Sequence, residues 1–162
     1  MYKGIKDAKA LSLAAIFEIA KRYNDKEVEH SDNIADSEYL LKKYENRLIN
    51  QELENFILII LDRHKRIIHE ATLYKGNNHK LSISFHDIFK LVMMHDGFFI
   101  YVIHNHPSGT SRPSKEDIVF TRELANRCDK MEISLIDHLI IAKDGHYSFL
   151  KENYFKNAKK VA

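Results

Sequence analysis

The sequence predicts an α/β fold in which helices flank one mixed β-sheet. Two apolar runs, Phe56–Leu61 and Phe98–Ile103, have the unbroken apolar character of strands that are buried on both faces. A segment with helical spacing, Lys115–Lys130, follows the second run, and another apolar strand follows that helix at Leu135–Ala142. Strands that alternate with helices along a chain are typical of α/β architectures.

The N-terminal part of the chain predicts two helices joined by a linker. Across Lys6–Arg22 the apolar residues recur at helical spacing, among good helix formers. Residues 23–36 are polar and predict a linker. Ser37 is a suitable N-cap for a helix over Glu38–Glu45.

The remaining elements follow in order from the first apolar strand. Asp62–Lys65 predicts a turn and Arg66–Tyr74 an antiparallel return strand. The spacing of Ile88, Leu91 and Val92 predicts a helix that ends at Asp96-Gly97. Further along, we expect the strand Phe98–Ile103, a loop at Asn105–Pro113, the helix Lys115–Lys130, the strand Leu135–Ala142, a turn at Asp144-Gly145 and a short strand at His146–Leu150.

Length and charge set limits on organisation and partners. The 162 residues, 44% of them hydrophobic, suffice for one compact domain with a short appendage. We expect an N-terminal helix and linker over residues 1–36 and the domain over residues 37–162. Lys and Arg total 25 against 23 acidic residues, a balance too even to indicate a nucleic-acid partner from charge alone.

Cysteine content and hydropathy indicate the compartment. The lone Cys128 excludes a disulfide within the chain and any cysteine-rich zinc site, which suits a reducing cytoplasm. No stretch approaches the roughly 18 apolar residues of a membrane span, and no signal peptide opens the chain. We therefore expect a cytoplasmic protein without a membrane partner.

Three residues around the central loop have the character of metal ligands. His104 and His106 directly follow the second apolar run, and residues i and i+2 of an extended chain point to one side, roughly 6.5 Å apart. Asp117 lies in the first turn of the next predicted helix. Two imidazoles and one carboxylate leave a fourth tetrahedral position for water, which is the pattern of a catalytic rather than a structural zinc. Zinc would lower the pKa of that water towards roughly 7.

Each part of this pattern has a plainer interpretation when taken alone. Ser114 with Asp117 resembles a capping box, with Asp in place of the usual Glu or Gln. A single His-x-His at a strand end is a weak indication of a metal. The combination of both parts, between a buried strand and a helix, is what favours a metal site.

The same residues resemble a known family. His104-x-His106-Pro107 followed by Ser114-x-x-Asp117 is similar to the JAMM motif of MPN+ metalloproteases. The longer run His-Asn-His-Pro-Ser-Gly resembles the RadC-like branch in particular, as does Ile-Asp-His-Leu-Ile at residues 136–140. The resemblance extends over about residues 37–155.

The resemblance implies a fold, a cofactor and residue roles. The fold would be a JAMM/MPN-type mixed β-sheet flanked by helices, with cytidine-deaminase-like layering. His104, His106 and Asp117 would hold one Zn²⁺ per chain, and Ser114 would steady the oxyanion of a tetrahedral intermediate. The family also places a glutamate base upstream, on a strand paired near the metal-bearing one.

Glu70 is the residue that we match to this base, and an ordinary exposed glutamate is its alternative interpretation. One departure is that Gly76 follows Glu70 by six residues, where RadC-like chains have a glycine after three to five, so the loop there would be longer. Asp137 and His138, at the start of a predicted strand, leave two roles open. They are either satisfied structural residues or partners that orient a ligand imidazole.

The N-terminal segment resembles the end of the helix-hairpin-helix module that precedes the JAMM domain in full-length RadC-like proteins. In that module a Gly-hydrophobic-Gly hairpin presents backbone amides to a phosphate. Here Gly4-Ile5-Lys6 has lysine at the second glycine, so residues 1–36 are expected to hold only a remnant of the module.

Two functions are compatible with these observations. The first is a zinc-dependent metallohydrolase, in which a zinc-bound water activated by Glu70 attacks an amide carbonyl of a peptide or isopeptide-linked substrate. The alternative is a RadC-type DNA repair or recombination accessory protein with a non-catalytic or vestigial metal site. We expect weak or absent nucleic-acid binding, and a homodimer is left open.

Overall fold

The computed structural model of the chain describes residues 9, 11–16, 35–76 and 83–154. The chain divides into two compact units, Met1–Ser31 and Asp32–Ala162. In the first unit, residues 9 and 11–16 are helical, within the predicted N-terminal helix. The remainder of that helix, the Gly4–Lys6 hairpin and most of the predicted linker lie outside the described residues. Among the described helices, none has the length and apolar character needed to span a membrane.

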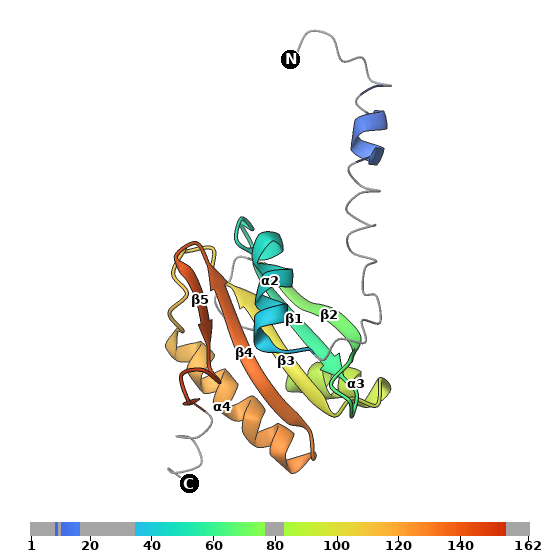
Figure 1. Cartoon of the computed structure of the whole chain (residues 1–162), viewed down its shortest axis with the longest axis vertical. Helices are drawn as coiled ribbons and strands as arrows, with labels where there is room; N and C mark the ends of the chain where they lie inside the picture. The colour runs from blue at the N-terminus through green and yellow to red at the C-terminus, as the bar shows by residue number, and fades with distance from the viewer. Residues whose placement is uncertain (1–8, 10, 17–34, 77–82, 155–162) are drawn as a thin grey trace. The chain divides into compact units, whose positions relative to one another are not determined.

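In the described residues of the second unit, one five-stranded mixed sheet packs with three helices (Figure 1). The strand order is β2-β1-β3-β4-β5; β1 is antiparallel to both β2 and β3, β3 is parallel to β4, and β4 is antiparallel to β5. In chain order the elements are α2 (Ser37–Leu48), β1 (Glu54–Leu61), β2 (Ile67–Gly76), α3 (Phe85–Met94), β3 (Phe99–Asn105), α4 (Lys115–Lys130), β4 (Ser134–Ala142) and β5 (Gly145–Ser148). The predicted α/β class with a mixed sheet is therefore confirmed.

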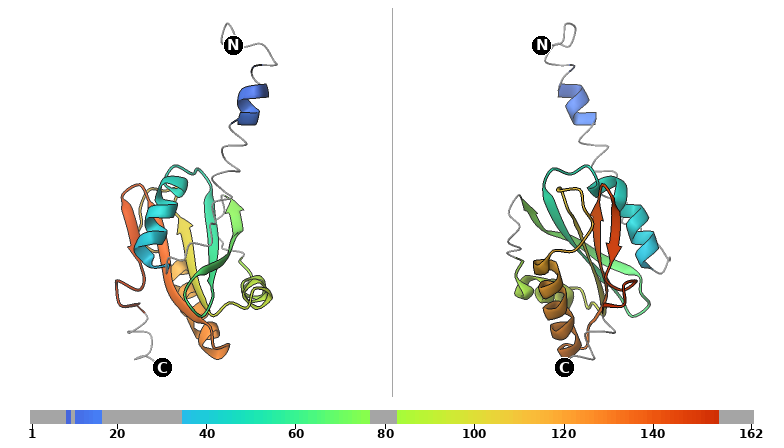
Figure 2. Two further views of the ribbon diagram at one scale, coloured as in Figure 1. Left: turned by 45° about the vertical axis from the view of Figure 1, so that its right-hand side comes forward. Right: turned by 90° about the vertical axis from the view of Figure 1, so that its left-hand side faces the viewer.

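The helices form layers on the two sides of this sheet. α2 covers one face, and α3 and α4 cover the other, as the views in Figure 1 and Figure 2 agree. The helix α4 connects the parallel strands β3 and β4, which is the usual crossover of a βαβ unit. All eight residues of β1 are buried, as expected for a strand covered on both faces.

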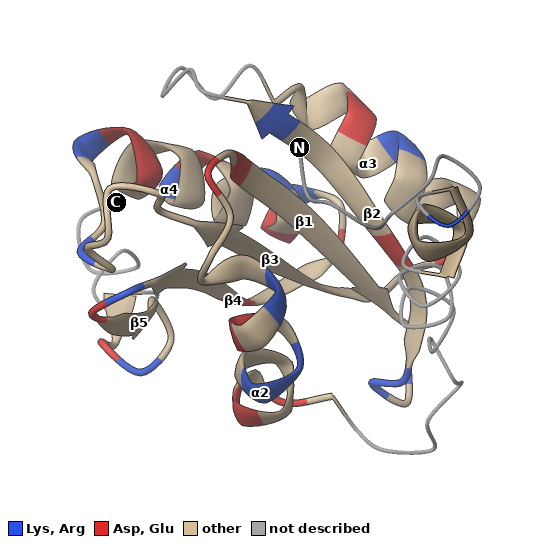
Figure 3. Ribbon diagram, turned by 90° about the horizontal axis from the view of Figure 1, so that it is seen from above, with Lys and Arg blue, Asp and Glu red and all other residues tan. Residues whose placement is uncertain are grey.

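Charged residues are distributed over the outer elements of the second unit. Lys and Arg alternate with Asp and Glu along the helices and turns that Figure 3 shows. In α2, for example, Glu38 lies in the first turn and Arg47 in the last, where each complements the helix dipole.

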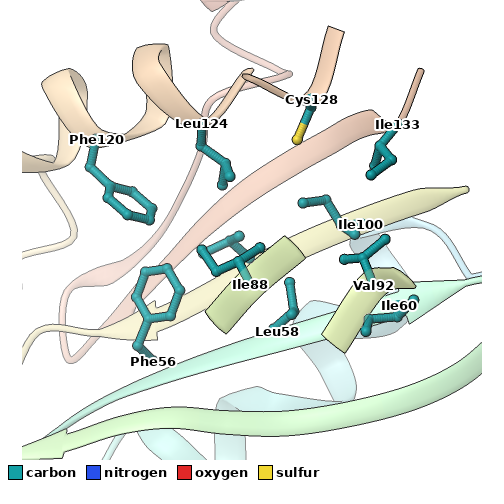
Figure 4. Close-up of a cluster of buried hydrophobic side chains, with 11 residues drawn as sticks. Phe56, Leu58, Ile60, Ile88, Val92, Ile100, Phe120, Leu124, Cys128 and Ile133 are labelled. Carbon is teal, nitrogen blue, oxygen red and sulfur yellow. The ribbon is translucent and has the colours of Figure 1, made fainter. Parts of the chain in front are cut away.

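One cluster of buried hydrophobic side chains lies between the sheet and the layer of α3 and α4 (Figure 4). Since side chains alternate along a strand, residues 56, 58 and 60 of β1 point into this core, and residues 57, 59 and 61 point towards α2. Its members are Phe56, Leu58, Ile60, Ile88, Val92, Ile100, Val102, Phe120, Leu124, Cys128 and Ile133. This alternation decides which side of the sheet each polar residue can reach.

Polar contacts link the α2 face of the sheet to α2 and to Ala35, just before that helix. The hydroxyl of Tyr101 donates to the Ala35 carbonyl at 3.4 Å, and the hydroxyl of Ser37 donates to Asp137 at 2.8 Å. Tyr101 alternates with its core-facing neighbours on β3, so its side chain marks the face that α2 covers.

The start of α2 and the end of β3 differ from the prediction in ways that matter for the site. The N-cap of α2 is Asp36, whose side chain accepts from the backbone N–H of Tyr39 at 2.7 Å, so Ser37 is the first helical residue. The strand β3 continues through His104 and Asn105, because both residues still pair with β4. His104 is thus part of the strand rather than the first residue after it.

Candidate metal centre

The end of β3 and the start of α4 bring three predicted ligands together. His104 is the sixth residue of β3, and the backbone N–H of His106 donates to the Ile141 carbonyl at 3.0 Å, which continues the parallel alignment beyond the strand. Asp117 is the third residue of α4. His104 and His106 point to the same side because they are two residues apart in extended chain.

His104, His106 and Asp117 form the His–His–Asp cluster. One ligand atom from each lies within 4.8 Å of the others, a grouping that could hold a metal ion. The two Nε2 atoms are 2.9 Å apart, and each lies 3.3 Å from an oxygen of Asp117. His104 and Asp117 are buried and His106 is half-buried, so the cluster lies at the edge of the core. The structure therefore brings all three predicted ligands to one point.

Charge interactions within the cluster shift two pKa values. Burial would raise the pKa of Asp117, but the neighbouring His104 and His106 rings and the Ser114 hydroxyl hold it well below its usual range. Burial would lower the pKa of His106, but Asp117, the Thr110 carbonyl and the charge of Glu54 together raise it. An ionised carboxylate beside two imidazoles is the electrostatic arrangement that favours a cation.

The loop between β3 and α4 fixes the His106 ring. Nδ1 of His106 lies 2.8 Å from the Thr110 carbonyl oxygen, and since a carbonyl only accepts, Nδ1 must carry the proton. The loop turns at Gly109, whose φ of 92° is in the region that favours glycine. It is anchored to the β4–β5 turn because Asp144 accepts from Ser111 N–H at 2.8 Å and donates its own N–H to Gly109 at 3.1 Å.

Ser114 and Asp117 form a capping box at the start of α4, as the plainer interpretation of this pair predicted. The Ser114 hydroxyl oxygen accepts from Asp117 N–H at 3.0 Å, and its proton is donated to Asp117 Oδ2 at 2.6 Å. The backbone N–H of Ser114 also donates to Oδ2, at 2.7 Å. The box therefore orients the carboxylate, and an oxyanion contact would require the hydroxyl to rotate.

Glu70, predicted as the base, lies away from the cluster. It pairs with Ile59, a residue of the α2 face, whereas His104 pairs with Phe56 on the core face. Its carboxylate binds Arg47 Nη1 at 2.9 Å and Lys43 Nζ at 3.3 Å, both on α2. We correct the prediction accordingly, since the sheet itself separates Glu70 from the His–His–Asp cluster.

The carboxylate that does lie beside the cluster belongs to Glu54, the first residue of β1. Glu54 is 6% exposed and lines a pocket with His106 and Asp117. Its position two residues before Phe56 places it on the core face, as alternation requires. The other lining residues are Ser108, Thr110, Arg112, Ser114 and Glu116.

The sequence did not identify Glu54, because this residue lies just before the apolar run Phe56–Leu61 and resembles an ordinary polar residue at the start of a strand. The available indication was its even spacing from Phe56, which becomes informative only when the register of β1 against β3 is known. That register is also maintained by Asn105, whose side chain accepts from Asn55 N–H at 2.8 Å and donates to the Leu53 carbonyl at 3.1 Å.

Asp137 and His138, whose roles the sequence left open, make different contacts on opposite faces of the sheet. Asp137 accepts from the Ser37 and Ser148 hydroxyls and from two backbone N–H groups, so it joins α2, β4 and β5. Burial raises the pKa of its carboxyl, although these bonds oppose the rise. His138 is fully buried on the other face, where its Nε2 lies 2.7 Å from Nδ1 of His104.

Comparison with known proteins gives a consistent result. The family model of the RadC-like JAB domain matches residues 34–154. UPF0758 proteins of Streptococcus agalactiae and Streptococcus gordonii are 32% identical to this chain over 150 and 149 residues, which is 93% and 92% of it. A UPF0758 protein of Coprothermobacter proteolyticus is 32% identical over 154 residues, 93% of this chain. The chain spans 66% of the length of each of these three relatives.

Proposed function

This chain belongs to the RadC-like JAB domain family, and on that premise we propose that it is a zinc-dependent hydrolase of amide, peptide or isopeptide bonds. The observation that supports the proposal most directly is the His–His–Asp cluster with the carboxylate of Glu54 lining the same pocket. The cluster supplies ligands, and Glu54 supplies a base that a purely structural metal site would not need.

The donor set of the cluster fits zinc. The Nδ1 atom of each histidine has a hydrogen-bond partner outside the cluster, Thr110 for His106 and His138 for His104. The Nε2 atoms are therefore the ones that face the Asp117 carboxylate. Two imidazole nitrogens with one carboxylate oxygen are the ligand set of catalytic zinc sites, which keep one position open.

Bound zinc would acidify a water in the open position and polarise the scissile carbonyl. The protein's own contribution begins with Glu54, whose carboxylate takes a proton from the attacking water and returns it to the leaving nitrogen. The pocket beside the cluster receives the substrate, and Arg112 is the cation among its lining residues. Ser114 would add a hydrogen bond to the oxyanion after its hydroxyl turns away from Asp117.

The proposal is tested by a cleavage screen with a peptide and isopeptide library, using the zinc-loaded chain. We expect cleavage that a chelator abolishes and that zinc restores. Glu54→Gln, which keeps the shape of the side chain, should retain zinc and lose cleavage. Full activity of Glu54→Gln, or cleavage that persists in chelator, would contradict the proposal.

A further inference from the structure

A series of short hydrogen bonds runs behind His104, on the side away from the pocket. Nδ1 of His104 lies 2.7 Å from Nε2 of His138, and Nδ1 of His138 lies 2.6 Å from the hydroxyl of Thr121. That hydroxyl donates to the backbone carbonyl of Asp117, also at 2.6 Å. The series thus connects β3, β4 and α4, and it begins and ends at residues of the His–His–Asp cluster.

The direction of each hydrogen bond in the series follows from the acceptor at its end, the Asp117 carbonyl. The Asp117 carbonyl can only accept, so Thr121 uses its single proton there and must accept from His138 Nδ1–H. A neutral His138 then has a bare Nε2, which can only accept from Nδ1–H of His104. His104 is in turn left with a bare Nε2, the atom that faces Asp117 and His106. One hydroxyl on α4 therefore sets the tautomers of two histidines.

Burial leaves these groups no substitute partners. The side chains of His104, Thr121 and His138 are each 0% exposed. The His138 ring stacks on Phe149 at 5.0 Å between centroids, with 9° between the planes, and meets the edge of Phe56. Because an unpaired polar atom in such surroundings is costly, the packed ring and its hydrogen bonds support a single arrangement.

We propose that His138 and Thr121 are positioning residues, which hold His104 in the Nδ1–H tautomer so that its Nε2 lone pair is presented to the metal. The inference rests on the metal site of the proposed function, but it does not depend on hydrolysis. The acceptor behind His104 is a neutral imidazole rather than a carboxylate, so Asp117 supplies the negative charge of the ligand set.

The first test compares two substitutions of His138 in the full chain. His138→Phe preserves a flat ring against Phe149 but removes the acceptor, and we expect zinc to bind about 10–100-fold more weakly in a chelator competition. His138→Gln has an amide oxygen that can accept from His104, so its zinc affinity should be close to that of the wild type. Long-range ¹H–¹⁵N spectra of the metal-free protein should show His104 with protonated Nδ1 in the wild type and with a larger Nε2–H population in His138→Phe.

A second pair of variants changes Thr121, which is one hydrogen bond further from the metal site than His138. This pair tests the proposal even if His138→Phe does not fold. Thr121→Val removes the acceptor of His138 Nδ1–H, so the tautomers of His138 and His104 should shift and zinc affinity should fall. Thr121→Ser restores the hydroxyl and should recover both. Cys128→Ala is the matched control, because Cys128 is equally buried on α4 and has no part in the series.

The outcomes separate this inference from the proposed function. Zinc binding without hydrolysis, with the expected losses in His138→Phe and Thr121→Val, would contradict the hydrolase and support the positioning role. Wild-type zinc affinity and an unchanged His104 tautomer in folded Thr121→Val would overturn the positioning role, whatever the enzyme activity. A loss in Cys128→Ala as large as that in Thr121→Val would also overturn it, since general packing would then explain the effect.

Discussion

Glu54 and Glu70 lie on adjacent strands of one sheet and point to its opposite faces. Glu54 lines the pocket beside the His–His–Asp cluster, and Glu70 binds Lys43 and Arg47 on α2. The two carboxylates are therefore separated by the sheet, although both are acidic residues near a predicted metal-bearing strand. Substituting each glutamate in turn can therefore show which of the two carboxylates acts in hydrolysis.

The first prediction compares Glu54→Gln with Glu70→Gln. Loss of the base in Glu54→Gln should lower the hydrolysis rate by on the order of 10²–10⁴ with zinc retained. Glu70→Gln should hydrolyse substrate at the wild-type rate when assayed well below its melting temperature. The measurements are kcat on a cleaved library peptide and zinc content by elemental analysis. The reverse ranking would return the base to Glu70.

A second prediction concerns metal stoichiometry. Three ligands imply one zinc per chain, and His104→Ala or Asp117→Ala should remove most of it. Both variants should still fold, because the core between the sheet and α3 and α4 consists of apolar side chains. Elemental analysis and circular dichroism check the two parts. Full zinc occupancy in His104→Ala would refute the ligand assignment.

The two functions of Ser114 can be separated by a pair of variants. Ser114→Ala should lower the free energy of unfolding by about 0.5–2 kcal/mol through the lost N-cap, whereas Ser114→Gly should lower it by only a few tenths. Zinc should remain in both, because the Ser114 backbone N–H still holds Asp117 Oδ2. If the hydroxyl also contacts the oxyanion, kcat should fall by roughly 10²–10³ in both variants alike. A fall that follows stability instead would assign Ser114 to capping alone.

Glu70 should contribute to stability in a pH-dependent way. Burial would raise its pKa, but Tyr44, Lys43 and Arg47 together hold it below its ordinary value of 4.5. A carboxylate with a lowered pKa stabilises the fold above its unfolded pKa, and this contribution is lost as the pH falls through the folded value. Glu70→Gln should therefore lower the free energy of unfolding by about 1–3 kcal/mol at pH 7, with the difference from the wild type shrinking below pH about 4.5. Urea unfolding at several pH values measures it; a difference that grows towards acid pH would contradict the assignment.

The last prediction concerns nucleic acid. A duplex binder needs a clustered basic surface, whereas acidic and basic residues are interspersed over the described elements (Figure 3). We expect a dissociation constant for duplex DNA in the weak non-specific range, roughly 10⁻⁴–10⁻⁶ M, by fluorescence anisotropy at physiological salt. A nanomolar constant would favour a DNA repair accessory over the hydrolase.

The elements themselves were predictable because they depend on local patterns. The apolar runs predicted β1, β3 and β4 to within two residues, and the limits of α4 were predicted as Lys115–Lys130. The His-x-His and Ser-x-x-Asp spacing likewise predicted residues that converge, since both patterns lie within or next to one βαβ unit. Strand periodicity and helix capping act over a few residues, so a single sequence records them directly.

Which carboxylate lies beside the His–His–Asp cluster, and which groups hydrogen-bond to its histidines, were decided by tertiary structure alone. Glu54, His138 and Thr121 come from three different elements, and what each contacts depends on strand register and on which face of the sheet it occupies. A one-residue change of register moves a side chain to the opposite face, so a glutamate on a strand next to the cluster can still point away from it. The local sequence thus determined the strands, the helices and the three candidate ligands. The pairing of β1 between β2 and β3 determined that Glu54 lies beside the candidate ligands and that Glu70 does not. Side chains alternate along each strand, but which face an odd or even position occupies is fixed only when the strands pair.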